Sequence, residues 1–492
     1  MTEYDIPLIV RGEVIHDHMV PFQGRRGGVS FRTPDVKRFI DRIVLRNPVE
    51  MEDMYRLSVA DVLDYLEELG ARLRLDTNAH LRQAMEMYLA ANVQSREILA
   101  QMYNGLSVAF NRASIEEAID KMMGIECLDG WERRQFADRE VQVRAFGART
   151  VHLNPGNSPA AAAFGLMHGS ILRCDNIVKF PSNDPFTATA LGLTMIEMAP
   201  THPITRHYTV GYWKGGDAGV EEHLYTPRNI EKILAWGGPS SMRQVRKYLV
   251  PGLDLIALDP KVSGSMIGSE AFESQESMNY VAEQIAKDVG LLNQAACLNA
   301  RVVYVESGAD TAGVERLERL GVLVHAAIQA LPSRFSSCSP DFPAQLRADI
   351  DAIRHDARYG VIGVEQSEGG VVVSRRGEPV PFKDELNGRV VNLVPVDRIE
   401  DALKWVTIDT QTIGVYPESL KERIRDRCAL QGAQRLTTLG CATYEAEGYP
   451  HDGIELFRRM VRWVVIENFE REVVERGASF AHSQPGEHAG HS

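Results

Sequence analysis

Apolar residues recur at helical intervals between residue 34 and about residue 130. Side chains three and four positions apart share one face of a helix, so this spacing predicts a series of amphipathic helices. Ser58 and Ser114 stand where two of these helices begin and are candidate N-caps. The predicted helices cover residues 36–44, 57–73, 80–103 and 113–123.

The pattern changes at residue 139, where Val and Arg positions alternate on either side of a Phe-Gly-Ala break. Alternation is typical of strands, so residues 139–153 are predicted to form a two-stranded hairpin. From 153 to 262, short β-type runs alternate with helical segments, which favours parallel strands joined by right-handed crossovers. The predicted strands cover 176–180, 207–213, 232–238 and 253–259, and the predicted helices cover 186–199, 219–225 and 240–249.

A second α/β region follows, and it begins with a predicted helix that leads through a turn into a strand within 292–306. The small, polar residues after Gly477, rich in Gly and His, predict a disordered tail. The other elements predicted in this region are helices at 276–290, 311–330, 343–356, 400–406 and 419–429 and strands at 390–396 and 411–417.

Composition sets limits on the class of protein. A chain of 492 residues is expected to divide into two or more domains, because single cores stop growing at roughly 250–300 residues. The net charge of −13 gives no indication of a nucleic-acid partner, and no apolar run reaches the roughly 18 residues of a membrane span. Acidic residues at the N-terminus argue against a secretory signal, and six scattered cysteines without a CxxC pair favour neither disulfides nor a metal site. We therefore expect a cytoplasmic protein.

Two polar residues at turns could carry chemistry. Cys297 lies between a predicted helix and a predicted strand, in the segment Asn-Gln-Ala-Ala-Cys. A lone cysteine is usually a small buried apolar residue, but a position at such a turn also suits a nucleophile. Asn157 lies in a Pro-Gly-Asn-Ser-Pro turn. Asparagine is common in turns for its backbone conformation, and its amide could also donate a hydrogen bond to a developing oxyanion.

Two further features could bind a cofactor. Lys179 ends a predicted strand and is either an ordinary solvated charge or a cation for a cofactor hydroxyl or phosphate. The pair Gly237 and Gly238 precedes a helix that opens with Ser240, and backbone N–H groups at a helix N-terminus can bind a pyrophosphate. The pair does not match the G-x-G-x-x-G fingerprint, so taken alone it does not identify a cofactor site.

In this order the features resemble the aldehyde dehydrogenase superfamily. Pro-Gly-Asn-Ser-Pro is similar to its oxyanion turn, Asn-Ile-Val-Lys-Phe to its cofactor-lysine strand, and the segment around Cys297 to its nucleophile loop. Within the superfamily, residues 258–261, 294–297 and 450–463 resemble those of LuxC-type acyl-CoA reductases. The resemblance covers about residues 140 to 466.

The resemblance implies an aldehyde dehydrogenase-like α/β fold, with two parallel-sheet domains, a small β oligomerisation arm and a helical N-terminal region. The implied division is 1–135 for the helical part of the cofactor domain, 136–153 for the oligomerisation hairpin, 154–265 for the dinucleotide-binding domain, 266–450 for the catalytic domain, and 451–492 for a C-terminal helix and the disordered tail.

The same resemblance implies roles for individual residues. Cys297 would be the nucleophile and Asn157 the oxyanion donor. The implied cofactor-binding residues are Lys179 and Ser182 at the adenosine ribose, Gly238 and Ser240 at the pyrophosphate, and Glu385 at the nicotinamide ribose.

The chain departs from the hydrolytic members of the superfamily at informative positions. Ala257 stands where they have a general-base glutamate, and Gln294 lies three residues before Cys297, so their Gly-Gln-x-Cys is not kept. Ser182 replaces the acid found in many NAD-preferring members, which favours NADPH because no carboxylate repels its 2′-phosphate.

We therefore expect that the protein uses NADPH to reduce a long-chain fatty acyl-CoA, or a related acyl thioester, to the aldehyde. The reaction is expected to pass through a cysteine acyl-enzyme. Expected partners are the acyl-CoA or acyl-protein thioester and an acyltransferase or acyl-protein synthetase, in a homo-oligomer. One alternative is an aldehyde dehydrogenase that forms an acid or an acyl-CoA. Another is a scaffold subunit of an acyl-transfer complex.

Overall fold

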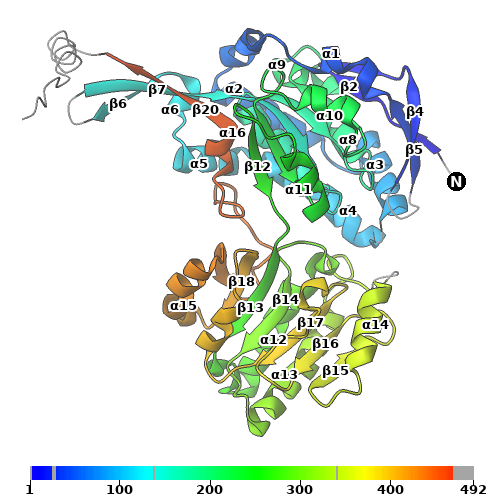
Figure 1. Cartoon of the computed structure of the whole chain (residues 1–492), viewed down its shortest axis with the longest axis vertical. Helices are drawn as coiled ribbons and strands as arrows, with labels where there is room; N and C mark the ends of the chain where they lie inside the picture. The colour runs from blue at the N-terminus through cyan, green and yellow to red at the C-terminus, as the bar shows by residue number, and fades with distance from the viewer. Residues whose placement is uncertain (1–2, 25–28, 93, 137–138, 339–341, 469–492) are drawn as a thin grey trace, which may run out of the picture.

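The computed structural model describes residues 3–24, 29–92, 94–136, 139–338 and 342–468. Two α/β lobes lie one above the other, and a narrow β arm projects from the upper lobe (Figure 1). Each lobe is built around one seven-stranded sheet, which confirms the predicted pair of α/β domains. Among the residues that the structure describes, no helix combines the length and the apolar character needed to cross a membrane.

The sheet of the upper lobe, called the first sheet, has the strand order β12-β11-β8-β9-β10-β2-β3. The strands from β12 to β10 run parallel, and β2 and β3 extend one edge in antiparallel fashion. The strands predicted between residues 153 and 262 are all present in it. The bounds are β2 Leu8–Val10, β3 Glu13–Ile15, β8 Arg149–Leu153, β9 Asp175–Lys179, β10 Tyr208–Gly211, β11 Lys232–Trp236 and β12 Asp254–Leu258.

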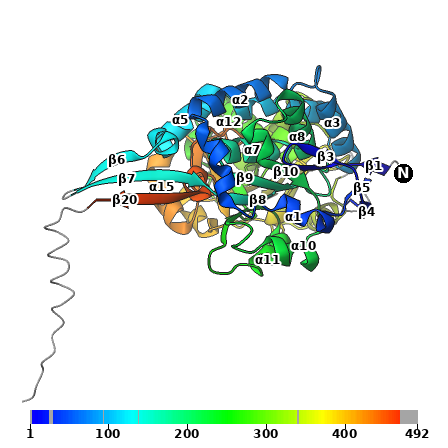
Figure 2. The same ribbon diagram turned by 90° about the horizontal axis from the view of Figure 1, so that it is seen from above.

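Helices cover both faces of the first sheet (Figure 2), with α2, α7 and α8 on one face and α10 and α11 on the other. Ser58 caps α2 as predicted, in a capping box with Asp61. Ser114 is not a cap, because Asn111 accepts a hydrogen bond from the Ser114 backbone N–H at 3.0 Å and caps α5 one turn earlier. The bounds are α1 Ile40–Ile43, α2 Val59–Arg72, α3 Ala79–Ala91, α4 Arg96–Asn104, α5 Arg112–Met122, α6 Glu126–Asp129, α7 Ala160–Ile171, α8 Thr187–Met198, α9 Pro203–Arg206, α10 Ala218–Leu224 and α11 Pro239–Arg246.

The N-terminal segment differs from the helical region that was expected there. Residues 3–34 contain β2 and β3 and a small sheet with the order β1-β5-β4. Its strands are β1 Glu3–Asp5, β4 Met19–Gln23 and β5 Ser30–Pro34. These runs are too short to show a period, and β2 forms because it pairs with the edge of β10.

The arm also corrects two predictions. Its strands have the order β20-β7-β6, with bounds Val461–Glu467, Arg139–Gly147 and Glu132–Phe136. The hairpin therefore consists of β6 and β7, and the Phe-Gly-Ala break separates β7 from β8. A side chain at Gly147, within this break, would lie 2.3 Å from the backbone oxygen of Arg173. The C-terminal helix is limited to α16 (Leu456–Met460), because the residues after it pair with β7 as β20. The tail after Gly477 lies outside the described residues.

The sheet of the lower lobe, called the second sheet, has the order β15-β16-β17-β14-β13-β18-β19, in which only β15 is antiparallel to its neighbour. The predicted helix 400–406 is a 3-10 helix, η8 (Ile399–Trp405). The bounds of the strands are β13 Val262–Ile267, β14 Ala300–Val305, β15 Tyr359–Gly363, β16 Gly370–Ser374, β17 Val390–Pro395, β18 Thr410–Tyr416 and β19 Arg435–Thr438. The helices are α12 Gln275–Gly290, α13 Thr311–Ala330, α14 Ala344–Ile353 and α15 Glu418–Gln431.

The topology of the first sheet marks where a ligand would bind. From β8 the chain places β9 and β10 on one side, and it later returns to place β11 and β12 on the other. Ligands of open α/β sheets bind at the carboxyl ends of strands where the order reverses in this way. The turn after β8 carries Asn157, and the turn after β11 carries Gly238, so both meet at this position.

Candidate active site

Cys297 lies in a tightly held loop between the short 3-10 helix η6 (Leu291–Gln294) and β14. Three consecutive residues, Leu292 to Gln294, have left-handed φ values of 57°, 54° and 61°, which β14 and its neighbours stabilise. The Gln294 amide donates to the backbone oxygens of Ala300 and Val390, at 2.9 Å each. The Ser263 hydroxyl donates to the Cys297 backbone oxygen at 2.7 Å. The loop is therefore fixed before any substrate arrives.

The Cys297 side chain is half-buried, and its surroundings keep it a neutral thiol. Burial, together with the negative charges of Asp452 and Glu445, raises the pKa of Cys297 to about 11, although the neighbouring Gln411 side chain acts in the opposite direction. A thiolate is the attacking species in acyl transfer, so a proton must leave this sulfur during the reaction.

Asn157 lies 140 residues before Cys297 in sequence and contacts the loop of Cys297 from the other lobe. The Asn157 side-chain amide donates to the backbone oxygen of Ala295, two residues before Cys297, at 3.3 Å. A hydrogen bond stabilises the turn that carries Asn157, because the Asn183 side-chain amide donates to the Gly156 backbone oxygen at 2.8 Å. A side chain at Gly156 would lie 1.8 Å from the Asn183 side chain, so it would displace the amide that stabilises this turn. The turn of Asn157 and the loop of Cys297 are thus in contact.

Lys179 and Ser182 lie where β9 ends in the first sheet. The Lys179 ammonium lies 5.9 Å and 5.7 Å from the ring centroids of Tyr212 and Trp213, which place the cation beside the strand ends. Ser182 is buried, and the structure places no acidic residue at this position.

Gly238 is the N-cap of α11, and Ser240 follows in the first turn of that helix. A side chain added at Gly238 would meet no atom within 4 Å, so the helix N-terminus is open, and Ser240 is exposed. Backbone N–H groups at an open helix N-terminus suit a pyrophosphate. Together with Lys179 this donor set fits a dinucleotide cofactor.

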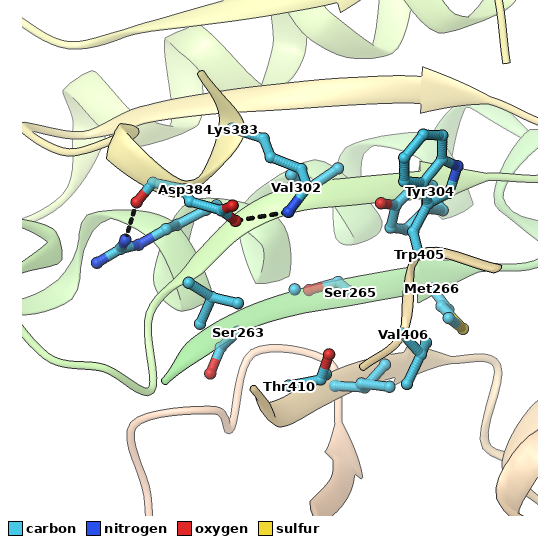
Figure 3. A pocket seen from close by; sticks show the side chains of 14 residues that line it. Ser263, Ser265, Met266, Val302, Tyr304, Lys383, Asp384, Trp405, Val406 and Thr410 are labelled. Carbon is cyan, nitrogen blue, oxygen red and sulfur yellow. Dashed lines mark hydrogen bonds and ion pairs between the residues drawn. The ribbon is translucent and has the colours of Figure 1, made fainter. Parts of the chain in front are cut away.

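Glu385 lies apart from these groups, in the short 3-10 helix η7 (Lys383–Glu385), and it is exposed. Arg301 links this helix to the nucleophile loop: its guanidinium donates to the Asp384 backbone oxygen, and its charge interacts with both Glu385 and Cys297. A cavity of about 50 Å³ opens beside Arg301, and Figure 3 shows Lys383 and Asp384 paired at its rim over Ser263, Met266 and Tyr304. Its volume suits water rather than a long chain.

Ala257 lies within β12 and pairs with Ala235 of β11. The position thus carries a methyl group and no base. Sequence reasoning missed a cluster beside Cys297 that consists of Gln411, Glu445, Glu447, His451 and Asp452. The sequence Pro-His-Asp-Gly at 450–453, in which two titratable residues precede a glycine, is the signal that could have located the cluster.

The structure resembles solved aldehyde dehydrogenases. Aldehyde dehydrogenase 21 from Physcomitrella patens, in complex with succinate, matches with a TM-score of 0.72 and 12% identity, over 95% of this chain and 99% of that one. NADP-dependent glyceraldehyde-3-phosphate dehydrogenase from Bacillus halodurans, complexed with NADP, matches with a TM-score of 0.70 and 12% identity, over 94% and 99%. At such identities the likeness establishes the fold, which is that of the aldehyde dehydrogenases.

Sequence comparison identifies the family to which the chain belongs. The long-chain acyl-protein thioester reductase of Vibrio harveyi is 24% identical over 472 residues, which cover 94% of this chain and 93% of that protein. The enzyme of the same description from Photorhabdus luminescens is 26% identical over 429 residues, covering 85% and 84%. The family model described as acyl-CoA reductase (LuxC) matches residues 54–463, most of the chain. The chain therefore belongs to the LuxC family, whose model is described as acyl-CoA reductase, and it has the fold of the aldehyde dehydrogenases.

Proposed function

We propose that this protein reduces an acyl thioester, either a long-chain acyl-CoA or an acylated partner protein, to the aldehyde with NADPH. The observation that carries the proposal is the meeting of the Asn157 amide with the loop of Cys297, at 3.3 Å from Ala295. Nucleophilic acyl transfer requires this pairing of an attacking sulfur with a donor for the oxyanion. The printed descriptions of the relatives favour an acyl-protein thioester as one acyl source.

The residues divide the work as follows. Cys297 attacks the thioester carbonyl, and Asn157, with the Cys297 backbone N–H, stabilises the oxyanion until the thiol leaves and an acyl-enzyme remains. Lys179, Ser182, Gly238 and Ser240 would bind the dinucleotide, and the nicotinamide, when bound, supplies a hydride. Ala257 stands in place of the general-base glutamate that the resemblance assigns to hydrolytic members, so their route to hydrolysis of the acyl-enzyme is absent.

The arm supports a homo-oligomer as part of the proposal, because apolar side chains are exposed on it, including Phe136 at 55% and Val465 at 52%. An acyltransferase or an acyl-protein synthetase would deliver the acyl group in the cytoplasm.

The test is acylation of the protein in the absence of nicotinamide. Wild-type protein incubated with labelled acyl-CoA should gain one acyl mass, which peptide mapping should locate at Cys297. Cys297→Ala should gain none, while Cys441→Ala, which removes an exposed cysteine, should acylate normally. Undiminished acylation of Cys297→Ala would place the nucleophile elsewhere and refute the mechanism.

A further inference from the structure

A group of partly buried titratable side chains lies beside Cys297 on the segment that leads from β19 back to α16. No step of the proposed mechanism uses this group. Its members and their side-chain exposures are Asp452 at 5%, His451 at 19%, Glu447 at 20% and Glu445 at 30%. Titratable groups clustered beside a reactive side chain are candidates for a functional role.

A tight turn fixes the directions of His451 and Asp452. His451 and Ile454 exchange both backbone hydrogen bonds, at 3.0 Å and 2.8 Å. Asp452 and Gly453 between them have φ values of +51° and +71°, the combination that a type I′ turn requires and that Asp-Gly sequences favour.

The turn connects the thiol to the imidazole through a short row of groups. The Gln411 side chain neighbours the Cys297 thiol and donates from its amide to the Asp452 carboxylate. Asp452 exerts the strongest charge interaction on the thiol. The His451 Nε2 lies 4.0 Å from Asp452 Oδ1 and is a buried nitrogen without a hydrogen-bond partner among the described residues. A buried polar atom without a hydrogen-bond partner calls for a functional explanation.

The other side of the imidazole is also held. His451 Nδ1 lies 3.2 Å from Glu445 Oε2, which fixes the ring and leaves Nε2 toward Asp452. The ring lies 5.2 Å from that of Trp236, the last residue of β11, directly before the Gly237-Gly238 turn. The imidazole therefore lies between the nucleophile and the turn proposed to bind the cofactor.

Charged groups from several elements face His451. Glu445, Glu447 and Asp452 lie on its own segment, Arg435 of β19 lies 4.0 Å from Glu445, and His168 of α7 lies 3.7 Å from Glu447. Burial by itself lowers the pKa of His451, but the hydrogen bond to Glu445 and the three carboxylates outweigh burial, so the pKa is raised and the imidazolium is favoured.

The chemistry of reduction needs such a proton. When the acyl-enzyme is reduced, its carbon gains a hydride, the carbon–sulfur bond breaks to release the aldehyde, and one proton must return to the Cys297 sulfur. We propose, resting on the proposed function, that His451 supplies this proton through Asp452, with Glu445 and Gln411 as the positioning residues of the pair. The Nε2 proton moves to the Asp452 carboxylate and the carboxyl proton moves to the sulfur, after which solvent reprotonates His451.

The experiment separates the two half-reactions. His451→Asn, Asp452→Asn and the exposed control His355→Asn are acylated with labelled acyl-CoA without nicotinamide, and the isolated acyl-enzymes are then mixed with NADPH in a single turnover. We expect acylation within about threefold of wild type in His451→Asn and in the control, and no slower than wild type in Asp452→Asn, because that change removes a charge that raises the pKa of Cys297. Reduction should fall by about 10²–10⁴ in His451→Asn and Asp452→Asn, which is the usual loss on removing an acid–base group, and should not change in the control.

The pH profile distinguishes proton donation from a structural role. The wild-type reduction rate should fall as pH rises through the pKa of His451, and His451→Asn should lack this limb. Glu445→Gln, which removes the carboxylate on Nδ1, should move the limb to lower pH. NMR titration of labelled histidine in the protein without cofactor reads the same pKa independently of activity, with the His451 signal assigned by its loss in His451→Asn.

Equal losses in acylation and reduction, or a pH limb that persists in His451→Asn, would overturn the proposal. A wild-type protein that never acylates at Cys297 would overturn the proposed function instead, so the two failures are distinguishable.

Discussion

Replacing Asn157 by alanine tests the oxyanion donor, because the structure predicts a small effect on stability and a large effect on the rate of acylation. The side chain is exposed and makes one neutral hydrogen bond, of 3.3 Å, to Ala295. Such a bond contributes about 0.5–1 kcal/mol to folding at most. An amide that donates to a developing oxyanion contributes more: its removal typically costs about 10²–10³ in rate, or about 2.7–4 kcal/mol. We therefore expect Asn157→Ala to fold normally and to acylate 100- to 1,000-fold more slowly.

The assay is quenched-flow acylation with labelled acyl-CoA at saturating concentration, read as mass added to the protein, together with urea unfolding of the same samples. Asn104→Ala is the matched control, because Asn104 is also an exposed amide with one long hydrogen bond, to the Leu75 N–H at 3.4 Å, and it lies on α4. A loss below tenfold in the maximal acylation rate would refute the oxyanion role. A loss of several kcal/mol in unfolding free energy would show that Asn157 is a structural residue instead.

Further outcomes follow from other positions. Wild-type protein should have a higher kcat/KM with NADPH than with NADH. Ser182→Glu should shift the ratio of the two kcat/KM values toward NADH by about 5- to 150-fold, since a carboxylate repels a 2′-phosphate by about 1–3 kcal/mol. An unchanged ratio would count against the placement of Ser182 at the adenosine ribose. With aldehyde and oxidised cofactor but no CoA, the wild type should give one burst of reduced cofactor and then nearly stop. Ala257→Glu should release carboxylic acid faster than the wild type, by up to about 10²–10⁴. Rapid release of acid by the wild type would favour an ordinary dehydrogenase. Burial lowers the pKa of His152 to about 4. Between about pH 6.5 and pH 4, His152 is therefore protonated in the unfolded state but not in the folded state, so the free energy of unfolding falls as pH falls through this window. The stability lost between pH 7 and pH 5 in urea unfolding should be smaller in His152→Gln by about 2 kcal/mol, and an equal loss in both proteins would contradict this.

Local sequence patterns predicted the regular elements well where the period was long enough to read. The helix predicted at 311–330 is α13, Thr311–Ala330, and the four strands predicted between 153 and 262 all lie in the first sheet. Short elements failed for a shared reason. Strand β2 has three residues and exists because it pairs with β10, and β20 forms because β7 offers it an edge. The Gly147 bend similarly depends on how closely the backbone of Arg173 approaches, which no local pattern records.

The sequence by itself determined which residues could react: a cysteine at a helix-to-strand turn, an asparagine in a turn, a lysine ending a strand and an alanine in place of a base, each readable because it stands at the end of a predicted element. The tertiary structure decided which of these meet. Asn157 reaches the loop of Cys297 from the other lobe, and His451, Asp452 and Glu445 arrive beside Gln411 from a return segment more than 140 residues after the nucleophile. The physical reason is that a nucleophile needs only its own turn to be recognised, whereas its proton donor is defined by burial and by neighbours that folding alone brings to it.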